Sequence, residues 1–152
     1  MSDFQKPIVA PPTIFGVSLI VSALFGFVSP TPFLPLLLQL TAGPAIILSG
    51  VLIIRSSMRE IAAANTTYDP FAQSNALVTT GIYRHSRNPG YLGLAIIQFG
   101  FSALLDNLWI AVAALLAMAV TDHWVIRLEE KKLSDKFGAS YRAYCDAVRR
   151  WI

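Results

Sequence analysis

The sequence has little charge, and a long part of it has none. Of its 152 residues, 55% are hydrophobic and only 14% are charged, whereas soluble domains have about 25% charged residues. No Asp, Glu, Lys or Arg occurs between Pro7 and Ile54, and few ionisable side chains occur between Asn88 and Ile126. A membrane-spanning helix needs about 20 apolar residues, so each of these two stretches has room for two spans. The composition therefore excludes an ordinary soluble domain.

Cysteine and histidine are also scarce, with one Cys and two His in the chain. The single Cys145 cannot form an intrachain disulfide, and we interpret it as a small space-filling residue. We expect no metal site, because so few residues could supply nitrogen or sulfur ligands. The formal net charge of +3 does not indicate nucleic-acid binding, because the basic residues lie beside apolar spans and not on a soluble basic face.

Turn residues divide the apolar stretches into four expected spans, at about residues 12–28, 42–64, 89–105 and 108–128. Ser29–Pro32 predicts a turn after the first span because of its two prolines. The apolar segment Phe33–Leu40 is short and Gly43-Pro44 interrupts it, so we interpret it as a connection that dips into the membrane interface.

The second half of the chain shows further helix boundaries. Asp106-Asn107 predicts a tight turn between the third and fourth spans. The fourth span should continue as a helix to Phe137-Gly138, because glycine commonly ends a helix. A short amphipathic helix over Ser140–Trp151 is expected to follow. The predicted fold class is thus all-α, an integral membrane bundle of about four transmembrane helices with a cytoplasmic C-terminal amphipathic helix, forming a single membrane domain over residues 1–152.

The distribution of basic residues predicts the orientation of the bundle. With four spans, Lys6, the 55–88 connection and the segment after Ile126 share one side, which then holds all 12 Lys and Arg residues. Basic residues accumulate on the cytoplasmic side of membrane proteins. We therefore expect an inner or cell membrane protein with both termini in the cytoplasm.

Two segments on that side contain most of the ionisable residues. In the first, residues 81–93, Asn88 can cap the third span and leave backbone N–H groups that attract anions. In the second, which begins at Arg127, Glu129 lies seven residues after Asp122 and should share its helix face. A hairpin of the last two spans would join anion-binding donors to carboxylates, and such a pocket suits a zwitterionic ligand such as an amino acid.

These segments also carry a family resemblance. The order and spacing of Leu77–Tyr83, Arg87–Gly93, Glu129-Glu130, Phe137-Gly138 and the Tyr141/Tyr144 pair resemble the isoprenylcysteine carboxyl methyltransferase family. The related phospholipid N-methyltransferases share this pattern. The resemblance covers residues 65–152 and implies that this half binds S-adenosylmethionine in a membrane-embedded catalytic site without a Rossmann fold.

The resemblance also implies particular site residues. The residues expected to contact the cofactor are Asn75, Ala76, Leu77, Val78, Tyr83, Arg87, Asn88, Pro89, Gly90, Tyr91, Glu129 and Glu130. Arg127 is the candidate for the acceptor side, and His85 or Asp122 could take a proton from an amine or thiol acceptor. The alternatives are that the arginines and His85 contact lipid phosphates and that the two glutamates lie on a solvated helix face.

The sequence thus predicts an S-adenosylmethionine-dependent methyltransferase in the bilayer that acts on a lipophilic small molecule or lipid through a carboxylate, amine or thiol. The alternative function is a non-catalytic assembly or transport subunit with the same helical hairpin. A transporter would be expected to carry ionisable residues at mid-span, and spans one to three have almost none. No nucleic-acid partner is expected, and self-association as a homo-oligomer is left open.

Overall fold

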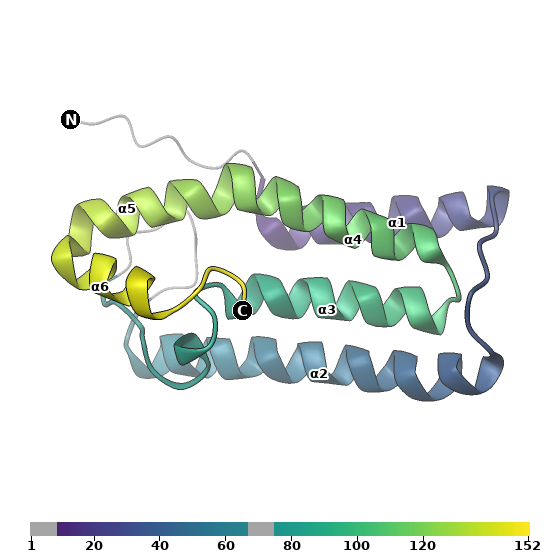
Figure 1. The fold of residues 1–152 in the computed structure, drawn as a ribbon, viewed down its shortest axis with the longest axis horizontal. Helices are drawn as coiled ribbons and strands as arrows, with labels where there is room; N and C mark the ends of the chain where they lie inside the picture. Colours follow the sequence, from purple (N-terminus) through teal and green to yellow (C-terminus); the bar gives the residue numbers. More distant parts are fainter. Residues whose placement is uncertain (1–8, 67–74) are drawn as a thin grey trace.

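The computed structural model describes residues 9–66 and 75–152, and these residues form helices and connections with no strand. The long helices lie side by side along the longest axis of the molecule (Figure 1). Three helical segments are long and apolar enough to cross a membrane: Pro11–Val28, Leu36–Ala63 and Leu108–Phe137. Lys6 and residues 67–74 of the expected polar connection lie outside the described residues.

Helix α1 covers Pro11–Val28 and helix α2 covers Leu36–Ala63. Two prolines begin α1, where a missing N–H costs nothing. The prediction that residues 33–40 form a connection between two spans was wrong for residues 36–40, because α2 begins there and continues through Pro44. Asp106 explains this start, since its Oδ1 accepts hydrogen bonds from the backbone N–H groups of Phe33 (2.7 Å) and Leu34 (2.9 Å) just before the helix. Proline inside an apolar membrane helix is commonly tolerated.

The second half of the chain forms a helical hairpin. Helix α3 covers Pro89–Leu104, and helix α4 covers Leu108–Thr121. The intervening turn is at Asp106 and Asn107, as predicted; Asp106 has a φ of 49°, and the Asn107 side chain caps α4 by accepting from the Trp109 N–H at 3.0 Å.

Helix α4 continues without a break into a π-helical turn, Asp122–Ile126, and then into α5, Arg127–Phe137. Gly138, with a φ of 54°, ends α5 as the sequence indicates. Helix α6 covers only Ala139–Ala147, so the predicted helix over Ser140–Trp151 was too long. The chain is extended at Val148, and the residues after it return to the beginning of α3 (Figure 1).

Glycines bring α2 and α3 into close contact. Gly43 and Gly50 on α2 face Gly93 and Gly100 on α3, and each pair is spaced by seven residues. A Cβ added at Gly50 would lie 2.7 Å from the Gly93 carbonyl oxygen, and one added at Gly93 would lie 2.8 Å from the Gly50 carbonyl oxygen. Small residues at such positions let the backbones of membrane helices approach closely. This contact fixes α3, which begins at the candidate site.

Buried polar side chains join the other helices. Gln98 on α3 is 2% exposed, and its Nε2 donates to Ser18 Oγ on α1 at 3.0 Å. At the start of α4, Asn107 Nδ2 donates to the Ser22 carbonyl of α1 at 3.3 Å. Buried polar groups need such partners, so these bonds fix the register of α1 against α3 and α4.

Candidate functional site

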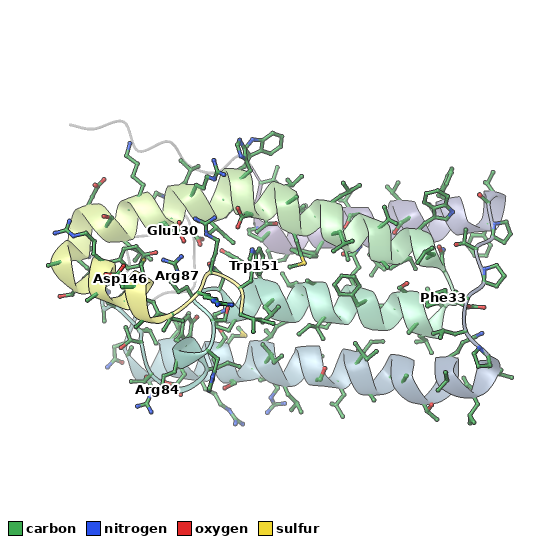
Figure 2. The ribbon with its side chains drawn as sticks, viewed as in Figure 1. Phe33, Arg84, Arg87, Glu130, Asp146 and Trp151 are labelled. Atoms are coloured by element: carbon green, nitrogen blue, oxygen red, sulfur yellow. The ribbon has the colours of Figure 1, made fainter. Side chains whose placement is uncertain are left out.

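Most of the ionisable side chains of the described residues gather at one end of the bundle, which we call the basic end. It comprises the 81–88 segment and the start of α3, together with the π-turn, α5, α6 and the C-terminal segment, residues 148–152. Figure 2 shows Arg87, Glu130 and Trp151 close together there, whereas Phe33 lies at the opposite end. The connections at that opposite end, residues 29–35 and 105–107, contain no Lys or Arg.

The 81–88 segment is attached firmly to α2. A short 3-10 helix, η1, covers Gly81–Arg84, and Gly81 has a φ of 55° that favours glycine. Tyr83 is buried; its hydroxyl lies 2.8 Å from Ser57 Oγ on α2, and its carbonyl accepts from the Tyr144 hydroxyl at 2.7 Å. Burial raises the pKa of the Tyr83 phenol to about 12, so this side chain stays protonated at neutral pH and acts as a structural link.

Two arginines and two carboxylates form an ion-pair cluster at the centre of the basic end. Arg150 Nε and Nη2 donate to the two oxygens of Glu130 at 3.0 and 2.6 Å. Arg150 Nη1 also contacts both oxygens of Asp122, at 3.0 and 3.2 Å. Hydrogen bonding to Glu130 raises the pKa of the Arg150 guanidinium above its usual range. Trp151 Nε1 donates to Asp122 Oδ1 at 3.1 Å.

Arg87 completes this cluster from the segment before α3. Its Nη2 lies 3.2 Å from Glu130 Oε1, and its Nη1 donates to the sulfur of Cys145. The third donor, the Nε–H, is buried and finds no partner among the described residues. An unpaired buried donor on a charged group is costly. This N–H is therefore a position where a ligand acceptor would be stabilised.

Glu129 lies next to Glu130 in sequence but has different partners. Its Oε1 accepts from the Tyr91 hydroxyl at 2.6 Å, and none of the arginines in the described part of the chain forms an ion pair with it. Tyr91 is in the first turn of α3, beside buried Pro89 and Gly90. The first turn of a helix presents N–H groups without intrahelical partners, so a carboxylate and an anion-attracting helix end lie together.

The expectation that Asp122 and Glu129 share a helix face was wrong. Asp122 shares its partner, Arg150, with Glu130 instead. The physical reason is the π-turn that begins at Asp122. A π-turn contains one more residue than an α-helical turn, so Glu130, eight residues after Asp122, aligns with it in place of Glu129. Such π-turns frequently occur at functional sites.

The predicted cap of α3 was also wrong in detail. Asn88 occupies the N-cap position, but its side chain makes no capping hydrogen bond. Asn88 Nδ2 donates instead to the Arg150 carbonyl at 3.0 Å, and the Arg87 N–H donates to the Arg149 carbonyl at 3.0 Å. The Asn88 side chain thus attaches the C-terminal segment to the beginning of α3.

The remaining predicted residues take no part in the ion pairs of this cluster. Arg127 and His85 are exposed. Asn75 is exposed, and its N–H donates to Thr66 Oγ1 at 2.8 Å. Ala76 and Val78 are half-buried. Leu77 packs against three buried residues, Tyr141 and Tyr144 of α6 and Val148 just after this helix. Burial raises the pKa of the Tyr141 and Tyr144 phenols well above the usual range, which agrees with a packing role.

Sequence reasoning missed Arg150 and Trp151, which it placed in a terminal helix. Trp151 packs with Tyr91, Val125 and Ile126 and thereby brings Arg150 to the carboxylates. The only available signal was indirect: Asp122 and Glu130 needed cationic partners, and the arginines near the chain's end had none assigned. Local pattern alone did not show that the helix stops before Val148.

These features define an all-helical membrane protein with an acidic and basic cluster at one end of a helical hairpin. A sequence model of the phospholipid methyltransferase family matches residues 38–140. The chain belongs to this family and carries its membrane methyltransferase domain. It is also similar to an uncharacterized protein of Haemophilus influenzae, with 34% identity over 62 residues that represent 41% of this chain and 98% of that protein. Residues 148–152 lie beyond the range that the family model matches.

Proposed function

We propose that this protein is an integral membrane methyltransferase that uses S-adenosylmethionine to methylate a lipophilic or membrane-associated acceptor. Family membership supports the reaction class. The observation that carries the assignment to this site is the buried Arg87 Nε–H without a partner, located between the start of α3 and the acidic pair of α5.

The donor set at the basic end fits the charged groups of S-adenosylmethionine. The free N–H of Arg87 and the N–H groups at the start of α3 suit the carboxylate of the methionine part. Glu129, which no arginine of the described residues neutralises, suits its ammonium group.

The chemistry asked of the protein is mainly positioning. Bound S-adenosylmethionine supplies a methyl group already activated by its sulfonium. The chain's own residues hold the reactants in line and keep water out, and such orientation can supply about 7–11 kcal/mol of a barrier. The Asp122 carboxylate accepts hydrogen bonds from Arg150 and Trp151. A role as a base that takes a proton from the acceptor stays a prediction for Asp122 and for His85.

The acceptor is expected to reach the site from the bilayer. Helix α3 is apolar and 16 residues long, about 24 Å at 1.5 Å per residue, and we propose it as a fourth span beside the three longer helices. The basic end then faces the cytoplasm, because the basic residues lie there. Arg127 remains our candidate for contact with the acceptor's head group, since its exposure at this end leaves it accessible.

A binding titration tests the proposal. Purified full-length protein in detergent should bind S-adenosylmethionine, and this binding should persist in excess EDTA, because the described residues contain no group of metal ligands. Incubation with labelled donor, followed by mass spectrometry of extracted lipids and small thiols, should then identify the acceptor. Absence of donor binding by the folded protein would favour the non-catalytic alternative.

A further inference from the structure

The C-terminal segment is not part of the α3–α4 hairpin, but it contacts the residues at the basic end of both helices. Three of its contacts to the segment before α3 use backbone carbonyls: Arg149 accepts from the Arg87 N–H, and Arg150 accepts from Ser86 Oγ (3.3 Å) and Asn88 Nδ2. On its other side, Arg150 and Trp151 contact the π-turn and α5. The segment therefore adds a further connection between the two walls of the site, beside the direct Arg87–Glu130 and Tyr91–Glu129 contacts.

The distribution of hydrogen bonds within the cluster gives Arg150 a particular role. Arg150 supplies a donor to each oxygen of Glu130, whereas Arg87 contacts Glu130 through Nη2 alone. Because Arg150 satisfies most of this carboxylate, Arg87 does not need to turn its Nε edge toward it. The Nε–H of Arg87 stays buried and unpartnered as a result.

We propose that Arg150 is a positioning residue: by binding Glu130 and Asp122, it keeps the Arg87 Nε–H available for the carboxylate of the donor's methionine part. This inference rests on the proposed function. Without Arg150, Glu130 would keep Arg87 as its guanidinium partner, and a guanidinium readily forms a two-bond contact with a carboxylate. Arg87 would then turn to Glu130 and lose its contact with the donor.

Three probe ligands separate this role from a general structural one. S-adenosylmethionine and S-adenosylhomocysteine both carry the methionine-derived carboxylate and differ in the charge at sulfur. Methylthioadenosine keeps the adenosine and the thioether but lacks the amino acid part. Loss of an Arg87–carboxylate contact should affect the first two ligands equally and spare the third.

The test is calorimetric titration of the full chain with each ligand. We expect Arg150→Gln to weaken both carboxylate-bearing ligands about tenfold or more and to change methylthioadenosine affinity by less than about twofold. Arg150→Lys keeps the charge but lacks the planar fork, so it should give intermediate affinities. Arg149→Gln is the matched control, because the Arg149 side chain is exposed, and it should bind like the wild type.

A second control accounts for stability. Asn107→Ala removes the cap of α4 at the opposite end of the bundle and should lower the melting temperature without changing any of the three affinities. Equal weakening of all three ligands by Arg150→Gln, or unchanged or tighter binding of S-adenosylmethionine, would overturn the proposal. If Arg150→Gln does not fold, wild-type affinity in Arg150→Lys overturns it instead. Failure of the wild type to bind any ligand would reject the proposed function itself.

Discussion

At the scale of single residues, the two adjacent glutamates of α5 have separate tasks. They lie about 100° apart around a helix, so they face different neighbours. Glu130 binds two arginines and holds the C-terminal segment in place. Glu129 contacts Tyr91 at the start of α3 and forms no ion pair with an arginine of the described chain. Glu129 is thus the better candidate for direct contact with a cationic group of the donor.

We predict that Glu129→Gln weakens S-adenosylmethionine binding while leaving the fold intact. A hydrogen bond to a charged partner contributes about 1.5–3 kcal/mol, so the dissociation constant should rise roughly 10- to 150-fold. Calorimetric titration of the purified variant measures this change. Asp135→Asn is the matched control, because Asp135 is an exposed acid on the same helix, and it should bind normally. Wild-type affinity in a well-folded Glu129→Gln protein would remove Glu129 from the site.

At the scale of helices, the glycines of α2 and α3 set the distance between the two walls of the bundle. Their neighbours across the contact are mostly backbone atoms and the branched side chains of Ile47, Ile54 and Ile97. Backbone atoms cannot rotate away from an added methyl group as a flexible side chain can. Even alanine at these positions therefore requires the helices to separate.

Gly50→Ala should destabilise the protein by about 1–3 kcal/mol through overpacking. The added Cβ would meet the Gly93 carbonyl oxygen and Ile97 Cγ1, both at 2.7 Å. Gly16→Ala on α1 is the control, since a Cβ there meets nothing within 4 Å, and it should be neutral or stabilising by up to about 1 kcal/mol. Denaturation of both variants in mixed detergent gives the two free energies. Equal stability of the two variants would contradict close packing of α2 on α3.

At the scale of the whole molecule, the charge asymmetry between the two ends predicts the topology. Pro32, at the end without Lys or Arg, should face the outside, and Asn75, before the 81–88 segment, should face the cytoplasm. Both residues are exposed. In a Cys145→Ser background, a membrane-impermeant maleimide should label Pro32→Cys in intact cells and label Asn75→Cys only after permeabilisation. Labelling of position 75 in intact cells would reverse the orientation.

The sequence by itself determined the class of the protein and the main helices. Long uncharged stretches can only be accommodated as buried or membrane helices, and proline, glycine and the Asp106-Asn107 pair act locally on the backbone. For that reason the predicted ends of α1 and α5 agree closely with the structure. The motif residues from Arg87 to Tyr91 and the glutamate pair were also identifiable, because they are close in sequence within each segment.

Only the tertiary structure decided how these segments combine. The start of α2 depends on hydrogen bonds from Phe33 and Leu34 to Asp106, a residue distant in sequence. The π-turn at Asp122 changes which glutamate aligns with it, and the extended C-terminal segment brings Arg150 between Asp122 and Glu130. Each outcome depends on long-range contacts that compete with local helix formation, and local propensity does not determine the result of that competition.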